Sequence, residues 1–114
     1  MRKILIADDE RIERQGIRSL LEKKDYNLEI LEASNGKEAL EIARSQKPDI
    51  LLSDIKMPFM TGLELMEKVR QFDSEMAIII FSGYSDFEYA RLAIKYGVLG
   101  YVLKPVNPSE FYNV

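Results

Sequence analysis

Apolar residues gather in five short runs along the chain, separated by longer segments of mixed composition. The runs cover residues 3–7, 28–32, 49–53, 77–81 and 99–103. Such nearly continuous apolar runs are typical of strands buried on both faces of a parallel sheet. The second run also carries Glu29 and Glu32, which indicates a strand at the edge of the sheet.

Between the runs, apolar residues recur at helical spacing, so each intervening segment is expected to lay one helix face on the sheet. The sets are Ile12, Ile17, Leu20 and Leu21, then Ala39, Leu40, Ile42 and Ala43, then Leu65, Met66 and Val69, and last Ala90, Ala93 and Ile94. Helix-start signals are Asn35 with Glu38, Thr61 with Glu64, Ser85 with Glu88, and Asn107-Pro108-Ser109-Glu110. The alternation of apolar runs with segments of helical spacing predicts a doubly wound α/β fold with an all-parallel sheet.

The 114 residues correspond to a single domain with a sizeable core. A last helix that begins near Pro108 has less than two turns before Val114. A typical helix has about 11 residues, so we expect the final helix to be cut short.

Composition narrows the chemistry, because the chain has no His, Cys or Trp. Without His and Cys it has no Ser-His-Asp triad, no thiolate nucleophile, no zinc site of the usual ligands and no disulfide. The net charge of -3 argues against direct binding of nucleic acid by this stretch. No apolar run approaches the roughly 18 residues of a membrane span, and the start does not read as a signal peptide. A cytoplasmic location and no membrane contact are therefore expected.

Polar residues follow four of the five apolar runs. Asp8, Asp9 and Glu10 come after the first, Asp54 after the third, Ser82 and Gly83 after the fourth, and Lys104 and Pro105 after the fifth. Parallel strands bring these positions to one edge, where ligands of doubly wound sheets bind.

Three aspartates at one edge repel one another unless a cation neutralises them, and an all-oxygen site suits Mg²⁺. Lys104 and Ser82 would suit phosphoryl oxygens. Each residue alone also has an ordinary interpretation: Asp9 as the cap of the first helix, Asp54 as a polar turn, Lys104 as a solvated lysine. Only the placement of all these residues at one edge of the sheet favours a functional site.

The same residues resemble the receiver domain of two-component response regulators. The resemblance rests on Asp8-Asp9, on Asp54 with Met57-Pro58 and Gly62, on Ser82-Gly83-Tyr84 and on Lys104-Pro105, and it covers essentially the whole chain. It implies a flavodoxin-like, three-layer α/β/α sandwich with five parallel strands in the order 2-1-3-4-5.

The resemblance also implies roles for individual residues. Asp54 would be the phosphoacceptor for a phosphohistidine on a sensor histidine kinase. Asp9 would ligate Mg²⁺ directly, Asp8 mostly through water, and Asp54 and the backbone carbonyl of Lys56 would complete the protein's ligands. Lys104 would pair with the phosphoryl group once it has formed.

Ser82 and Tyr101 match the switch pair of such domains, and the Lys104-Pro105 bond is expected to be cis. Their rearrangement would change the surface around the fourth and fifth helices, where a homodimer would form. Residues 83–90 resemble receivers fused to AraC-type helix-turn-helix domains. DNA would then be contacted only through an output domain that these 114 residues lack.

Two other functions are weighed against this one. A Mg²⁺-dependent phosphatase with an aspartate nucleophile would use Asp8. Such enzymes carry an Asp-x-Asp motif in the turn after the first strand, where this chain has Asp8-Asp9-Glu10-Arg11. A receiver-like binding module that works without phosphorylation usually lacks an acidic or lysine position, and here all are present. We expect no enzymatic activity beyond the domain's own phosphoryl transfer and dephosphorylation.

Overall fold

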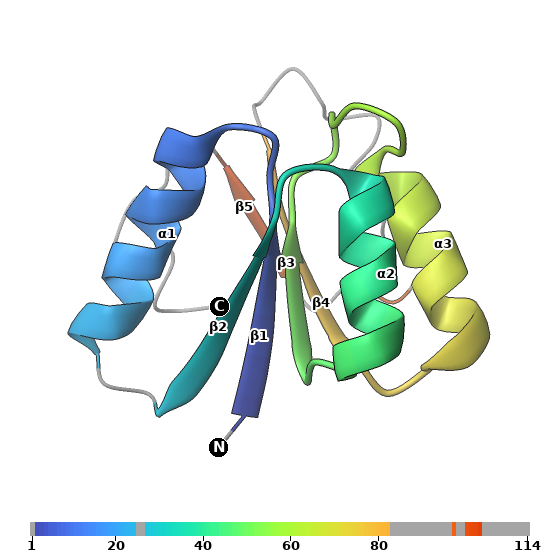
Figure 1. The fold of residues 1–114 in the computed structure, drawn as a ribbon, viewed down its shortest axis with the longest axis horizontal. Helices are drawn as coiled ribbons and strands as arrows, with labels where there is room; N and C mark the ends of the chain where they lie inside the picture. Colours follow the sequence, from blue (N-terminus) through green and yellow to red (C-terminus); the bar gives the residue numbers. More distant parts are fainter. Residues whose placement is uncertain (1, 25–26, 83–96, 98–99, 104–114) are drawn as a thin grey trace.

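Strands and helices alternate along the chain as the apolar pattern predicts (Figure 1). The computed structural model describes residues 2–24, 27–82, 97 and 100–103, and for residues 82 and 100–103 it describes the backbone alone. The elements are β1 (Arg2–Ala7), α1 (Arg11–Lys23), β2 (Leu28–Ala33), α2 (Gly36–Gln46), β3 (Ile50–Ser53), α3 (Gly62–Phe72), β4 (Ala77–Ser82) and β5 (Gly100–Leu103). Each predicted strand is present within one residue of its apolar run at either end.

The five strands form one parallel sheet in the order β2-β1-β3-β4-β5, as predicted. β2, the strand with Glu29 and Glu32, lies at an edge. Ala7 at the end of β1 pairs with Ala33 of β2 and with Ser53 of β3. The carboxyl ends of these three strands are therefore level with one another.

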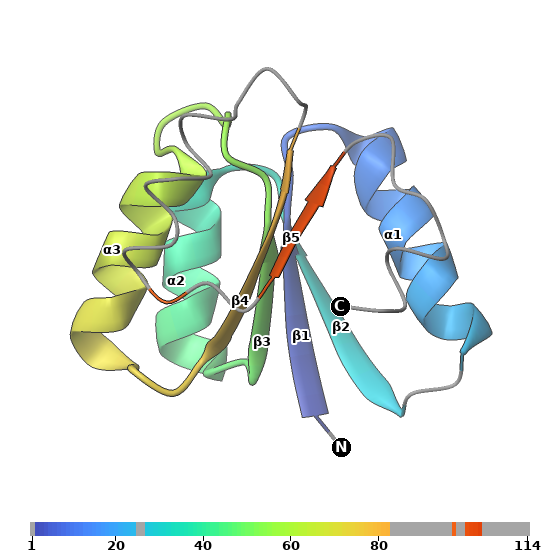
Figure 2. The ribbon, with the colours of Figure 1, turned by 180° about the vertical axis from the view of Figure 1, so that it is seen from behind.

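Among the described helices, α1 covers one face of the sheet while α2 and α3 cover the other (Figures 1 and 2). This arrangement confirms the three layers. The segment expected to form the fourth helix, and the one that begins near Pro108, lie outside the described residues.

The sheet separates two apolar layers, because successive residues of a strand point to opposite faces. Leu5, Leu51 and Ile78 pack with residues of α2 and α3 on one side. Ile4, Ile6, Leu52 and Phe81 pack with Ile17 and Leu21 of α1 on the other. Both faces of the central strands are buried, which explains why their sequences are apolar without a break.

Two of the predicted helix starts are confirmed. The side chain of Asn35 accepts a hydrogen bond from the Glu38 backbone nitrogen at 2.8 Å at the start of α2. At α3, Thr61 and Glu64 form a reciprocal capping box. The signals at Ser85 and Asn107 lie outside the described residues.

The interpretation of Asp9 as the cap of the first helix is wrong. α1 begins at Arg11, and its N-cap residue is Glu10. A cap accepts from amides at the second or third helical position, so a residue one place too early is badly placed for that role.

None of the helices in the described ranges combines the length and the apolar character that crossing a membrane requires.

Gly36 opens α2 against the loop between β3 and α3. A Cβ atom at this position would lie 2.2 Å from the carbonyl oxygen of Met60 and 2.7 Å from its Cβ. The start of α2 and the loop would have to move apart to make room for this Cβ atom. By contrast, a Cβ on Gly16 in the exposed part of α1 would meet nothing within 4 Å.

We predict opposite effects for alanine at these two glycines. Gly36→Ala should lower the free energy of unfolding by about 1–3 kcal/mol through overpacking. Gly16→Ala should raise it by roughly 0.5–1 kcal/mol, because alanine has the higher helix propensity. Urea unfolding followed by circular dichroism measures both. Equal effects of the two substitutions would contradict the close contact between α2 and the loop.

Candidate functional site

Two aspartates extend the sheet beyond the ends of neighbouring strands. Asp8 follows β1, and its nitrogen donates a hydrogen bond to the Ala33 oxygen at 3.1 Å. Asp54 follows β3, and its nitrogen donates to the Ala7 oxygen at 2.9 Å. The pairing of the strands therefore continues into the site and fixes the backbone of both residues.

Both carboxylates are buried, Asp8 completely and Asp54 with 5% of its surface exposed. A buried carboxylate is destabilising unless hydrogen bonds or counter-charges stabilise it. The Glu10 backbone nitrogen donates to Asp8 Oδ1 at 2.9 Å, and the Ile55 nitrogen donates to Asp54 Oδ1 at 2.7 Å. Backbone amides thus orient each carboxylate.

A third carboxylate joins the two aspartates from α1. Carboxylate oxygens of Asp8, Glu13 and Asp54 all lie within 4.8 Å of one another, and this trio is the one such group among the described residues. Glu13 lies in the first turn of α1, and helical side chains tilt toward the helix N-terminus. That tilt brings its carboxylate to the strand ends.

Glu13 was not among the site residues expected from the sequence, and the role of Asp9 as a direct ligand stays a prediction. Asp9 is exposed on the loop between β1 and α1. The available signal was the helix start at Arg11, which places Glu13 in the first turn near the sheet edge. We take the three-carboxylate group of Asp8, Glu13 and Asp54 as the acidic cluster.

The acidic cluster fits a hard divalent cation. Its donors are all oxygens, which Mg²⁺ prefers to the nitrogen and sulfur ligands typical of zinc. Three carboxylates this close repel one another, and a bound dication offsets that repulsion. The donor chemistry therefore agrees with the predicted magnesium site.

The loop after Asp54 is held from two sides. Ser53 Oγ donates to the Asp54 main-chain oxygen at 2.7 Å, and the Gly62 nitrogen donates to the Ile55 oxygen at 2.7 Å. A Cβ on Gly62 would lie 2.1 Å from the Asp54 oxygen, so this position requires glycine. The start of α3 thereby presses directly on the backbone of Asp54.

Further along the same loop, Met57 is buried, whereas Lys56 and Pro58 are exposed. Phe59 has a positive φ of 70°, and the Met60 nitrogen donates to the Pro58 oxygen at 2.7 Å. This is a γ-turn, an uncommon and strained conformation. It leaves the Phe59 side chain 84% exposed.

Other predicted site residues are described in part or not at all. Ser82 ends β4 and pairs with Leu103, and Tyr101 of β5 pairs with Ile80, but their side chains lie outside the described part of the chain. Lys104 and Pro105 also lie outside it. The switch pair, the lysine, the cis bond and the Lys56 carbonyl as a ligand stay predictions.

Comparison with known proteins identifies the family. The sequence profile of the response regulator receiver domain matches residues 4–114. The uncharacterized transcriptional regulatory protein YesN of Bacillus subtilis is 43% identical over 111 residues, which are 96% of this chain and 30% of YesN. The transcriptional regulatory protein HptR of Staphylococcus aureus is 38% identical over 111 residues, 96% of this chain and 43% of HptR. The chain spans less than half the length of these curated relatives.

Solved structures show the same fold. The REC domain of the response regulator AraT from Geobacillus stearothermophilus has a TM-score of 0.92 and 42% identity, with 98% of this chain and 88% of that chain covered. The two-component transcriptional regulator AraC from Clostridium phytofermentans has a TM-score of 0.87 and 36% identity, with coverage of 99% and 88%. Together with the parallel sheet and its acidic edge, these matches show that the chain belongs to the response regulator receiver domains, which have the flavodoxin-like α/β fold.

Proposed function

We propose that Asp54 accepts a phosphoryl group from a phosphohistidine on a sensor histidine kinase. The observation that supports this choice is the difference in exposure between the two strand-end aspartates. Asp8 is completely buried, whereas Asp54 keeps 5% of its surface exposed. A nucleophile has to be reached by its substrate, and of these two buried residues Asp54 is the more exposed, in agreement with the acceptor role that the resemblance gives it.

In the proposed step, a carboxylate oxygen of Asp54 forms a bond to phosphorus while the phosphorus–nitrogen bond of the phosphohistidine breaks. The electron pair of that bond stays on the imidazole nitrogen of the kinase, which takes up a proton from solvent. The Ile55 amide, 2.7 Å from Asp54 Oδ1, holds the carboxylate in a fixed orientation during the attack. Fixed orientation of the attacking group lowers the entropic part of the barrier.

Asp8 and Asp54 would help to hold Mg²⁺, and Glu13, whose carboxylate lies within 4.8 Å of theirs, would join them. By resemblance, Asp9 and the backbone carbonyl of Lys56 would add ligands. When bound, the ion supplies positive charge against the phosphoryl oxygens and the charge that develops in the transition state. The Glu10 amide keeps Asp8 aimed into the acidic cluster.

The remaining assignments rest on the family resemblance. Lys104 would pair with the phosphoryl group, and Ser82 and Tyr101 would transmit its arrival to the surface near the fourth and fifth helices, the face proposed for a homodimer. The relatives include transcriptional regulators more than twice as long as this chain. We therefore propose that the domain controls an AraC-type DNA-binding output domain. A cytoplasmic location stays a prediction.

The acceptor role predicts that Asp54→Asn abolishes phosphorylation. Incubated with Mg²⁺ and acetyl phosphate, the wild-type chain should form an acid-stable, base-labile adduct, visible by intact-protein mass spectrometry. Asp54→Asn should form none, because an amide oxygen is a poor nucleophile.

Asp49→Asn is a matched control, since Asp49 lies at the opposite end of β3 and accepts a hydrogen bond from the Lys3 nitrogen. It should be labelled like the wild type. Labelling of Asp54→Asn at the wild-type rate would overturn the assignment. Steady hydrolysis of a phosphomonoester that survives the substitution would instead support the phosphatase.

A second prediction concerns Glu13. Glu13→Gln should weaken Mg²⁺ binding roughly three- to tenfold, because cation affinity depends on the number of charged ligands around the site. Isothermal titration calorimetry measures the dissociation constant. Glu22→Gln removes the same charge from an exposed position of α1 and should leave the constant within about twofold of wild type. An equal effect of both variants would exclude a specific role for Glu13.

A further inference from the structure

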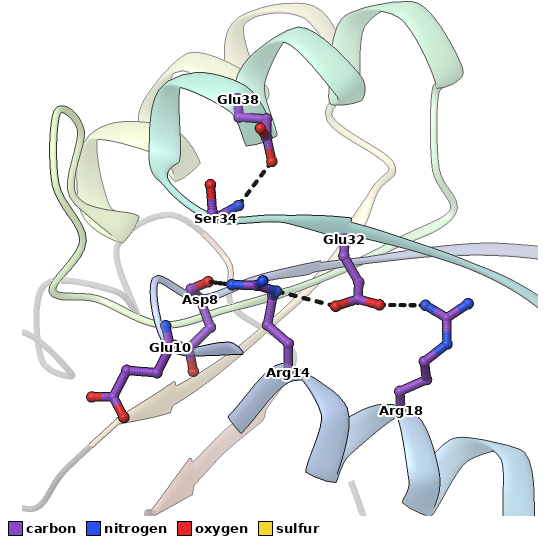
Figure 3. Close-up of polar contacts among 7 residues, drawn as sticks. All are labelled: Asp8, Glu10, Arg14, Arg18, Glu32, Ser34 and Glu38. Carbon is purple, nitrogen blue, oxygen red and sulfur yellow. Dashed lines mark hydrogen bonds and ion pairs between the residues drawn. The ribbon is translucent and has the colours of Figure 1, made fainter. Parts of the chain in front are cut away.

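Arg14 on α1 connects the edge strand β2 to the loop that carries Asp8. Its Nη1 donates to the main-chain oxygen of Asp8 at 2.7 Å, and its Nε donates to Glu32 Oε1 at 3.1 Å. Figure 3 shows the guanidinium between these two acceptors. One planar group thus bridges a loop and a strand that are far apart in sequence.

Glu32 is also held from its other side. Arg18, one helical turn after Arg14, forms an ion pair with Glu32 Oε2 (Figure 3). The two arginines contact different oxygens of Glu32, so the contact of Arg14 with Oε1 does not require Arg18. The Arg14 side chain is only 14% exposed, compared with 28% for Glu32 and 38% for Arg18. Solvent screens the Arg14 contacts least.

The contact to the Asp8 oxygen determines the orientation of the peptide group between Asp8 and Asp9. Asp8 is held at its own nitrogen by the Ala33 oxygen, and at its carboxylate by the Glu10 amide. The Asp8 oxygen is the remaining hydrogen-bonding group of its main chain, and Arg14 occupies it. The Glu10 amide belongs to the next peptide group, so a rotation at Asp8 that Asp9 does not compensate would move this amide away from Asp8 Oδ1.

We propose that Arg14, oriented by Glu32, is a positioning residue for the metal and phosphoryl site. It acts through the backbone of Asp8 and does not itself touch the bound ion. The inference rests on the proposed function, because it requires Asp8 to help hold Mg²⁺. Groups that orient metal ligands in this way typically contribute 10- to 100-fold to metal affinity.

A purely structural role is the competing explanation, since Arg14 also fastens α1 to β2. Arg18 offers a matched control for that role. It carries the same charge, pairs with the same carboxylate and belongs to the same helix, but it contacts Glu32 and not the Asp8 loop. A loss of general packing or charge should appear in both arginine variants, whereas a positioning effect should appear in Arg14 variants alone.

The test compares Mg²⁺ dissociation constants, measured by isothermal titration calorimetry, for the wild type, Arg14→Ala, Arg14→Lys, Glu32→Gln and Arg18→Ala. We expect about a tenfold loss for Arg14→Ala and a smaller loss for Arg14→Lys, because one ammonium replaces a planar group that spans two acceptors. Glu32→Gln should also weaken Mg²⁺ binding. Arg18→Ala should stay within about twofold of wild type.

The amide resonance of Glu10 in a ¹⁵N–¹H spectrum without Mg²⁺ gives an independent readout. It should shift in Arg14→Ala and keep its position in Arg18→Ala, because only the first removes the contact to the Asp8 oxygen, one peptide before the Glu10 amide. If Arg14→Ala is unfolded by circular dichroism, Arg14→Lys and Glu32→Gln decide the question by the same two measurements.

Three outcomes separate the possibilities. Failure of the wild type to bind Mg²⁺ would refute the proposed metal site itself. Wild-type binding with equal losses in the Arg14 and Arg18 variants would overturn the positioning role and leave the metal site intact. Wild-type affinity and an unmoved Glu10 resonance in the Arg14 variants would overturn it as well.

Discussion

The site depends on hydrogen bonds between parallel strands that continue one residue beyond the strands themselves. β1 pairs with β2 on one side and with β3 on the other, and Asp8 and Asp54 extend these two ladders. Their carboxylates are therefore placed by the paired central strands of the sheet. The apolar layers on both faces of β1 and β3 hold this register, since a one-residue slip would turn buried side chains to the wrong face. Without that register, two acidic side chains would not stay close together in a buried place.

The acidic cluster opposes the stability of the fold that carries it. Like charges at this separation repel, and two of the three carboxylates are buried. Backbone amides of Glu10 and Ile55 offset part of this repulsion and of the cost of burial, and a bound cation would offset more. Such local conflicts are common where a fold gives up stability for chemistry. The same conflict makes the site responsive, because a change of charge at Asp54 alters the balance of forces among all three side chains.

Most of the fold follows from apolar periodicity. The central strands are buried on both faces, so their runs are unbroken and easy to recognise, and the caps at Asn35 and Thr61 are local signals. The acidic edge was also predictable, because parallel strands bring their ends together. The place of Glu13 and Arg14 in the site could not be predicted from the sequence, because it depends on the direction in which α1 leaves the sheet. Glu32 was correctly taken as a sign of an edge strand, but its pairing with two arginines is a tertiary contact that no local pattern encodes.

The two glycines that open α2 and α3 set how closely these helices approach the backbone around Asp54. Gly36 rests on the backbone of Met60 and Gly62 on the backbone of Asp54, both at distances that leave no room for a methyl group. The loop between β3 and α3 is thus clamped between two helix starts, and packed backbone is nearly incompressible. A side chain at either glycine would have to displace this backbone, so the close approach of the loop to both helix starts depends on the absence of two side chains.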